Sequence, residues 1–312
     1  VVPLISSFAC AVPAIMATRT IENKRERLIT ILVAPLLTCS ARLPVYTILI
    51  GLLVPDTKLF GFMSVQALVL LAMYLLGIIT SVLAALIFKY IIKNEYRSFF
   101  ITEMPRYLLP SLKNVVFTIW ENTKAFIWNA GKIIVAASII LYVLGTNGGD
   151  KFRNTEQFVQ NKYPELSQTE LAPKISSYEL EHSYLGMMGK SIEPAIIPLG
   201  YDWKVGIALI SSIAAREVFV GTMSIIYSID SEEDLSIMQK LEKETNSNTG
   251  KPTFNFATCI SLLLFYAFSL QCMSTIAVTY KETKSIKWTG IQFLYMTILA
   301  YLVSFAAYQI LV

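Results

Sequence analysis

The chain has 312 residues, of which 54% are hydrophobic and 15% are charged, and its mean hydropathy is +0.56. A water-soluble globule of this size would have to expose much of that apolar surface, so the composition indicates a membrane protein. The net charge of +4 does not indicate nucleic-acid binding, because the basic residues lie in short loops between apolar runs. No basic stretch precedes the first apolar run, so we expect no signal peptide and regard the chain as a fragment of something longer.

Six apolar segments are long enough to cross about 30 Å of hydrocarbon, which takes roughly 20 helical residues. We predict spans at residues 28–55, 59–88, 125–144, 205–229, 254–280 and 288–312. Residues 1–18 are apolar but broken by Pro3 and Pro13, which predicts a half-helix or re-entrant piece, and residues 184–200 are short and broken in the same way. Residues 111–124 mix charged and apolar positions like an amphipathic helix in the interface. The sequence thus predicts an all-α, polytopic helical membrane protein with broken or re-entrant helices.

The basic residues predict the topology of the chain. Thirteen lysines and arginines fall in one set of loops and six in another, namely 19–27, 89–124 and 230–253 against 55–62 and 146–190. The positive-inside rule places the first set in the cytoplasm and the long polar segment 147–183 outside. Residues 254–280 could cross once or fold back as a hairpin near 269–272. The lysines that follow favour the hairpin, without deciding the side of the C-terminus.

Two stretches of the chain resemble each other. Residues 12–48 and 193–225 both carry Pro-Ala-Ile near their start and Ala-Arg within the following span. The later span is the third crossing after the earlier one, so the copies would be inverted, which is typical of alternating-access transporters. We therefore expect a first repeat with the following helices at 1–146, an external polar loop at 147–183, and a second repeat with C-terminal helices at 184–312. A chance match of short strings is the alternative.

Charged residues inside predicted spans need partners. An arginine or aspartate at a helix centre costs roughly 2.5 to 3.5 kcal/mol on insertion scales, so such residues face protein, water or each other. Arg42 and Arg216 are the buried cations, and Glu193 and Glu217 are the available acids. We expect one of these arginines to pair with one of these glutamates across the repeat interface. In the alternative, the arginines neutralise carbonyl groups at helix ends or reach the interface.

The segment around Cys39 predicts a polar face inside the membrane. Cys39 and Arg42 are three residues apart, so on a helix they share a face. Pro35 lacks an amide hydrogen and frees the backbone carbonyl of Ile31 on about the same side.

Two more cysteines lie where a helix break or a polar cluster is predicted. Cys10 comes three residues before Pro13, and Cys272 is followed by a methionine, a serine and a threonine. Together with Cys39 they suggest a path for a soft or borderline metal ion, because thiolates favour iron, copper and zinc. For each thiol the alternative is a small buried hydrophobe, which we expect for Cys259. We expect no disulfides, and the single histidine, His182, excludes a histidine-rich metal site.

Five longer motifs resemble one family. They are CAVPAIMATRTIE at 10–22, APLLTCSARLPVY at 34–46, PRYLLPSLKNV at 105–115, SIEPAIIPLGYDWKVGIALISSIAAREV at 191–218 and QCMST at 271–275. Together they are similar to the membrane domain of the ferrous iron transport protein B (FeoB) family over nearly the whole chain. Ala9 and Gln271 stand where that family commonly has glycine and proline, which changes the expected backbone geometry at these two positions.

The resemblance implies a multi-pass importer of Fe²⁺ in the bacterial inner membrane, with two gate repeats. It implies that Cys10, Cys39 and Cys272 line the iron path, and we add Glu193 and Glu217 as carboxylates or charge partners. It also implies a cytoplasmic N-terminal GTPase domain, which these 312 residues do not contain, and small cytoplasmic accessory proteins. The chain itself is then expected to be no enzyme, to lie in the lipid bilayer, and to need no cofactor. A homo-oligomer is left open.

Two other functions stay open on the residues alone. An organic-solute carrier of the nucleoside type would have similar gate repeats, but it would recognise its cargo through amides, hydroxyls and aromatic rings. A membrane scaffold without transport activity would need none of the polar groups described above. The sequence does not decide between a channel and a carrier, and it does not give the selectivity for Fe²⁺ over Mn²⁺, Co²⁺ or Zn²⁺.

Overall fold

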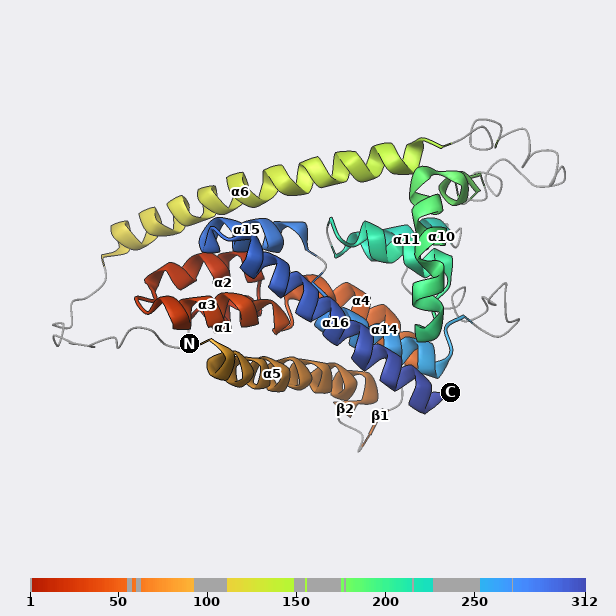
Figure 1. Cartoon of the computed structure of the whole chain (residues 1–312), viewed down its shortest axis with the longest axis horizontal. Helices are drawn as coiled ribbons and strands as arrows, with labels where there is room; N and C mark the ends of the chain where they lie inside the picture. Colours follow the sequence, from red (N-terminus) through yellow and green to blue (C-terminus); the bar gives the residue numbers. More distant parts are fainter. Residues whose placement is uncertain are drawn as a thin grey trace.

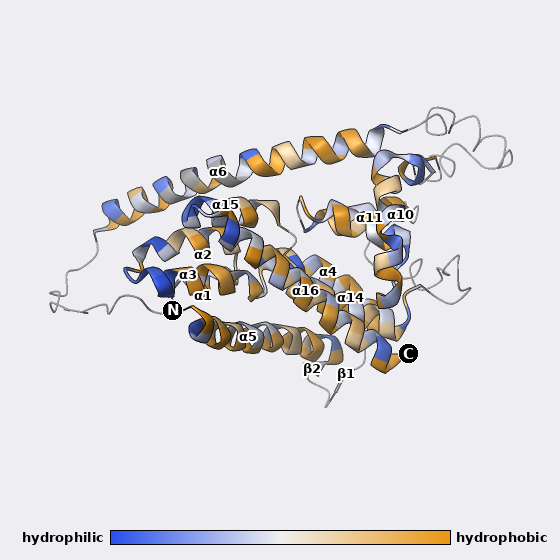
Figure 2. Cartoon of the chain, in the orientation of Figure 1, coloured by the Kyte–Doolittle hydropathy of each residue, from blue (hydrophilic) through white to orange (hydrophobic). Residues whose placement is uncertain are grey.

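The computed structural model describes residues 2–54, 58–59, 63–92, 111–148, 155, 175–176, 178–214, 216–226, 253–270 and 272–312. Within them, five helical segments are long and apolar enough to cross a membrane, namely Lys24–Leu53, Val65–Ile91, Leu112–Thr146, Phe256–Thr283 and Ile286–Leu311. The predicted all-α, polytopic membrane fold is therefore confirmed. Figure 2 shows apolar residues spread along these helices and hydrophilic residues gathered near the start of α3.

The first structural unit is a helical hairpin, an interrupted helix and a continuous helix (Figure 1). Its elements are α1 (Val2–Ser7), α2 (Ala11–Ala17) and η1 (Thr18–Thr20); α3 (Lys24–Val33), η2 (Ala34–Leu36), η3 (Ser40–Arg42) and α4 (Leu43–Leu53); and α5 (Val65–Ile91). The short antiparallel pair β1 (Lys58–Leu59) and β2 (Met63–Ser64) precedes α5, with Lys58 opposite Ser64 and Leu59 opposite Met63.

The second unit repeats this order. Its hairpin is α11 (Trp203–Ser211) and α12 (Val218–Ile226), its interrupted helix is α14 (Phe256–Phe268) and α15 (Met273–Thr283), and its continuous helix is α16 (Ile286–Leu311). The described helices between the units are α6 (Leu112–Thr146) and α10 (Tyr184–Ile196), followed by the turn η4 (Ile197–Leu199). Asn23 and Asp202 cap α3 and α11 by accepting hydrogen bonds from first-turn amides, which fixes where both helices begin.

Packing between the units is reciprocal. Hairpin helix α2 contacts α15 of the other unit, and hairpin helix α12 contacts α4 in the same way. Each continuous helix covers the interrupted helix of its own unit, α5 on α3 and α4, and α16 on α14 and α15. An ion pair between Arg27 near the start of α3 and Glu282 near the end of α15 brings opposite ends of the two interrupted helices together. The two helices are therefore antiparallel, as the predicted inverted duplication requires.

The register of the predicted duplication is wrong. Arg42 lies at the interruption of the helix α3–α4, whereas Arg216 lies at the tip of the hairpin α11–α12. Pro13 lies in hairpin helix α2, whereas Pro194 lies in α10, before the second hairpin begins. The shared strings therefore do not mark equivalent positions, and the repeat is visible in the order of elements instead.

Three predicted segments differ from the structure. Residues 205–229 do not form a sixth span, because α11 and α12 pack against each other and turn back. Residues 254–280 do not fold back as a hairpin: α14 and α15 make one interrupted crossing, and α16 returns along both. Residues 111–124 are not a separate interfacial helix but the first part of the 35-residue helix α6.

The structure describes little more than the ends of the two predicted polar loops. Most of the predicted external loop 147–183, and all of the polar segment 230–253 except residue 253, including its predicted charged helix, lie outside the described residues. Because α11 and α12 turn back, α14 starts at the end of the molecule where α6 ends (Figure 1). That end is opposite to the side that the positive-inside rule predicted for 230–253.

The core lies where the two interrupted helices cross. Tyr46 and Leu49 of α4 pack with Leu262 and Tyr266 of α14, and Met296 of α16 closes the cluster. Cys259 is buried in this core, as predicted for a packing cysteine. Burial of such side chains stabilises by about 1.5 to 3 kcal/mol each when the reference is water, but much less when the reference is lipid.

A charge cluster ties the first hairpin to the second interrupted helix. The Glu282 carboxylate accepts hydrogen bonds from Nε of Arg19 at 3.0 Å and from Nη2 of Arg27 at 2.8 Å. The Glu282 side chain is only 4% exposed, whereas the two arginines are 55% and 30% exposed. The carboxylate raises the pKa of Arg19, so this guanidinium stays charged at physiological pH.

We predict that Glu282→Gln lowers the stability of the chain in detergent by about 1 to 2 kcal/mol, because a neutral amide cannot hold both guanidinium groups. The thermal unfolding midpoint should fall by a few degrees. Glu181→Gln is the matched control, since Glu181 pairs with Lys190 at 3.0 Å but its side chain is 34% exposed, against 4% for Glu282. Equal midpoints for the two variants would contradict the cluster's structural role.

Candidate functional site

Four interruptions of the helices meet around one cavity of about 240 Å³. They are the tip of the hairpin α1–α2, the break between α3 and α4, the tip of the hairpin α11–α12, and the break between α14 and α15. The walls include Cys10, Pro35, Leu37, Cys39, Ser40, Ala214, Arg216, Glu217, Cys272, Ser274 and Thr275, together with Phe126 and Ile134 of α6. We call this space the thiol cavity.

Each of its three cysteines occupies the same local position, immediately before a helical turn. Cys10, Cys39 and Cys272 are the N-cap residues of α2, η3 and α15, and all three have extended backbone. None uses its side chain as a cap. An N-cap residue stands outside the helix, so its side chain is not directed along the helix face. Cys39 and Arg42 therefore do not share the face of a continuous helix, which corrects the sequence-based expectation.

Hydrogen bonds join each hairpin tip to the interrupted helix of its own unit. In the first unit, Ser40 donates to the carbonyl of Ala9 from its amide at 3.4 Å and from its hydroxyl at 2.9 Å. In the second unit, the amide of Met273 donates to the carbonyl of Ile213 at 3.0 Å. Backbone groups at membrane depth must find partners within the protein, and the tips and breaks supply them to each other.

Arg42 and Arg216 both donate hydrogen bonds to backbone carbonyl groups at the helix breaks. The fully buried Arg42 donates to Pro35 and Leu37 at 3.2 Å each and to Leu36 at 3.5 Å. Arg216 donates to the carbonyl of Ser269 at 3.0 Å, at the break of its own unit.

The expected arginine–glutamate pair is absent from the ion pairs of the described residues. Glu217 reaches the thiol cavity with an exposed side chain, whereas Glu193 lies on α10 and does not line it. The alternative weighed for the arginines, neutralisation of carbonyl groups at helix ends, describes both of them.

The backbone carbonyl of Ile31, which Pro35 leaves without an amide donor, accepts a hydrogen bond that was not predicted from the sequence. The side-chain amide of Gln292 donates to Ile31 at 2.8 Å, and the hydroxyl of Tyr295 donates to Leu32 at 2.5 Å. Both donors come from α16, so the second unit satisfies the backbone of the first. The available signal was a glutamine within an apolar span, since a polar side chain there needs a partner.

The thiol cavity is not a closed metal cage. Among the described residues, no three His, Cys, Asp or Glu side chains converge closely enough to hold an ion as they stand. All four cysteines are free thiols. The guanidinium groups of Arg42 and Arg216 are both within electrostatic range of Cys39. The cavity therefore offers dispersed sulfur ligands, one carboxylate and nearby positive charge.

Comparison with known families identifies this architecture. The model described as "Nucleoside recognition", the Gate family, matches residues 1–53 and 127–286, and these contain both hairpins and both interrupted helices. The chain belongs to the Gate family. A second model, "Ferrous iron transport protein B C terminus", matches residues 70–122. These matches confirm the family resemblance predicted from the sequence motifs.

Curated relatives of this Gate-family chain are iron transporters. The chain is 47% identical over 310 residues to an Fe(2+) transporter FeoB of Leptospira interrogans, covering 99% of the chain and 42% of the relative. It is 43% identical over 310 residues to that of Leptospira biflexa, with the same coverage. It is 35% identical over 324 residues to an Fe(2+) transport protein A/Fe(2+) transporter FeoB fusion protein of Porphyromonas gingivalis, covering 99% and 37%. The chain thus spans less than half of each relative. No solved structure matches the chain.

We predict that Arg42→Met destabilises the chain by about 2 to 4 kcal/mol, because it leaves three buried carbonyl groups without a donor. Arg42→Lys should lie between Met and wild type, since an ammonium lacks the planar fork that spans several acceptors. Thermal unfolding in detergent measures both, with Lys113→Met on the exposed surface of α6 as the control. Wild-type stability of Arg42→Met would contradict this role.

Proposed function

We propose that this chain is the membrane-embedded permease part of a ferrous iron importer in the bacterial inner membrane. The observation that carries the proposal is that Cys10, Cys39 and Cys272, far apart in the sequence, line one cavity where the helices are interrupted. The names of the curated relatives, each an Fe(2+) transporter, support Fe²⁺ as the cargo. The five apolar helical segments support a multi-pass position in the membrane.

Sulfur ligands suit this cargo. Thiolates favour iron, copper and zinc over magnesium and calcium, and an arginine beside a thiol favours the thiolate form. Arg216 lines the cavity together with the cysteines, and Glu217 adds a carboxylate. Because these groups are dispersed, the ion would bind through few of them at a time, with water completing its shell. A transport path requires binding that is favourable enough for entry and weak enough for exit.

The proposal that the chain is the permease part of an iron importer also implies protein partners. We propose that Fe²⁺ passage is linked to a cytoplasmic GTPase domain outside these 312 residues, so the chain itself carries no catalytic step. Accessory proteins are a further part of the proposal, and they are supported by the Porphyromonas gingivalis relative, whose name joins Fe(2+) transport protein A to the transporter.

A carrier of organic solutes is the second candidate, because the Gate family model is described as nucleoside recognition. The thiol cavity argues against it. Pockets for ligands of that size usually measure about 300 to 1,000 Å³, and this cavity measures about 240 Å³. Its polar wall is made of thiols, hydroxyls, one arginine and one carboxylate, without a side-chain amide among the described residues.

The test is uptake of radioactive Fe²⁺ by cells that lack other ferrous transporters. We predict that Cys10→Ser, Cys39→Ser and Cys272→Ser each lower uptake by about tenfold or more, the scale on which altered metal ligation acts. Cys259→Ala is the matched control, because Cys259 is buried in the core away from the cavity and should keep near-normal uptake. Unimpaired uptake in all three serine variants, at equal protein levels, would reject the thiol path.

A further inference from the structure

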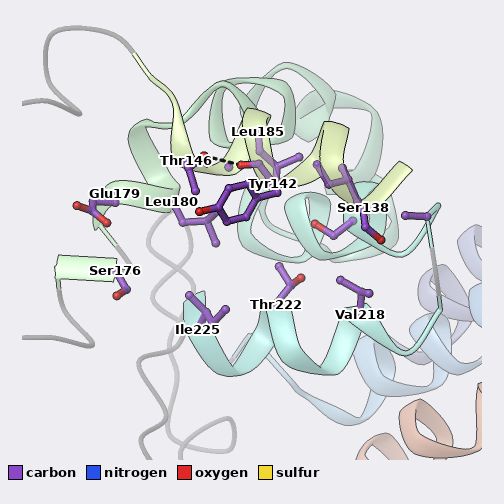
Figure 3. A pocket seen from close by; sticks show the side chains of 14 residues that line it. Ser138, Tyr142, Thr146, Ser176, Glu179, Leu180, Leu185, Val218, Thr222 and Ile225 are labelled. Atoms are coloured by element: carbon purple, nitrogen blue, oxygen red, sulfur yellow. Dashed lines mark hydrogen bonds between the residues drawn. The ribbon is translucent and has the colours of Figure 1, made fainter. Parts of the chain in front are cut away.

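A second, larger cavity adjoins the thiol cavity, and the function proposed above gives it no role. It measures about 650 Å³ and lies between α6, the start of α10 and the hairpin α11–α12 (Figure 3). Ala214 at the hairpin tip lines both cavities. Phe126 and Ile134 of α6 line the thiol cavity, and residues of 138–146 line the larger one. The two cavities therefore follow one another along α6.

Hydroxyl groups from three helices line the larger cavity. They belong to Ser138, Tyr142 and Thr146 of α6, Ser211 of α11 and Thr222 of α12. Figure 3 shows Thr222 on the opposite side of the cavity from Tyr142 and Ser138. Thr146 donates its hydroxyl hydrogen to the carbonyl of Tyr142 at 2.7 Å, and Ser211 donates to Ile207 at 3.0 Å. Since these hydrogens are used within the helices, the oxygens offer lone pairs as acceptors.

The charge of the lining suits a cation. Among the described lining residues there is no lysine, arginine or histidine, and Glu179 at the edge of the cavity is the one charged residue (Figure 3). The thiol cavity differs in this respect, because Arg216 belongs to its wall. A cation that keeps its water shell needs acceptors for the hydrogens of that water, and the hydroxyl oxygens provide them.

The larger cavity has room for a fully hydrated ion and for exchange of its water, whereas the thiol cavity is only slightly larger than one hydration shell. A shell of about six waters occupies about 180 Å³ at about 30 Å³ per water. The larger cavity, about 650 Å³, accommodates this shell with room for exchange, whereas the thiol cavity of about 240 Å³ leaves little beyond it. Replacement of water by sulfur would then coincide with passage from one cavity to the other.

We propose that the larger cavity is a vestibule in which a hydrated divalent cation is held by hydroxyl oxygens before it passes Ala214 and reaches the thiols. The vestibule comprises Ser138, Tyr142, Thr146, Ser211 and Thr222. This inference rests on the proposed function, because it names the step that precedes binding by Cys10, Cys39 and Cys272.

Isosteric removal of the hydroxyls tests the proposal. Thr222→Val with Ser138→Ala should raise the KM for Fe²⁺ uptake several-fold and leave the maximal rate nearly unchanged. The cobalt–thiolate absorption of purified protein loaded with Co²⁺ should stay as in wild type, because the thiol cavity is intact. Thr297→Val is the control, since Thr297, like Thr146, donates to a carbonyl of its own helix, at 2.8 Å, but lines neither cavity. An unchanged KM, or a lost cobalt signal, would overturn the vestibule.

Access to the vestibule is a second test, which needs no uptake. Thr222→Cys should react with a membrane-impermeant maleimide added to whole cells, as read by mass spectrometry of the peptide around residue 222. Prior addition of Co²⁺ or Mn²⁺ should slow the reaction. Labelling only by a lipid-soluble maleimide would mean that the cavity opens to the bilayer, and it would overturn the proposal.

The two proposals can fail separately. If only the vestibule is wrong, the serine variants of Cys10, Cys39 and Cys272 still lower uptake by about tenfold or more, while the Thr222 and Ser138 variants behave as wild type. If iron transport itself is wrong, cells that express the wild-type chain take up no more Fe²⁺ than cells without it.

Discussion

The structure depends on one constraint, which is that a helix interrupted at membrane depth exposes backbone groups that lipid cannot satisfy. Within the described residues, four such interruptions come together around one cavity. Hairpin tips accept hydrogen bonds from the breaks beside them, as Ala9 does from Ser40, and buried arginines donate to further carbonyls at the breaks. The polar cavity is thus a consequence of satisfying the backbone, and the cysteines lie within it because they occupy the first positions after the interruptions.

The antiparallel arrangement of the two units explains why thiols so distant in sequence share a wall. Cys10 begins the second helix of one hairpin, and Cys272 begins the second half of the other unit's interrupted helix. The helices that follow these cysteines, α2 and α15, pack against each other, and Glu282 joins α15 to Arg19 directly after α2. One contact between the units therefore fixes the relative position of two of the three sulfur atoms.

Much of the fold could be predicted from the sequence, because length and hydropathy of a span follow directly from the thickness of the bilayer. The cysteines that line the thiol cavity could be singled out as well, since each lies near a proline or beside a serine–threonine pair within an apolar run. Two features could not. Whether residues 205–229 cross or turn back depends on packing between α11 and α12. The partners of Arg42 are backbone carbonyls, and these cannot be recognised from the residue types in the sequence. The short motifs that predict the repeat lie in different structural elements of the two units, because the units share the order of their elements rather than residue identities at equivalent positions.

The hydrogen bonds from Gln292 and Tyr295 to the carbonyls of Ile31 and Leu32 have a consequence for biosynthesis. Membrane helices are delivered to the bilayer in order from the N-terminus, so α3 is inserted long before α16 is synthesised. Until α16 is inserted, two peptide carbonyls of the first unit are without the donors that they have in the folded chain. Folding of the first unit is therefore completed only by α16, and a nascent chain arrested before residue 292 would leave these two carbonyls without their donors.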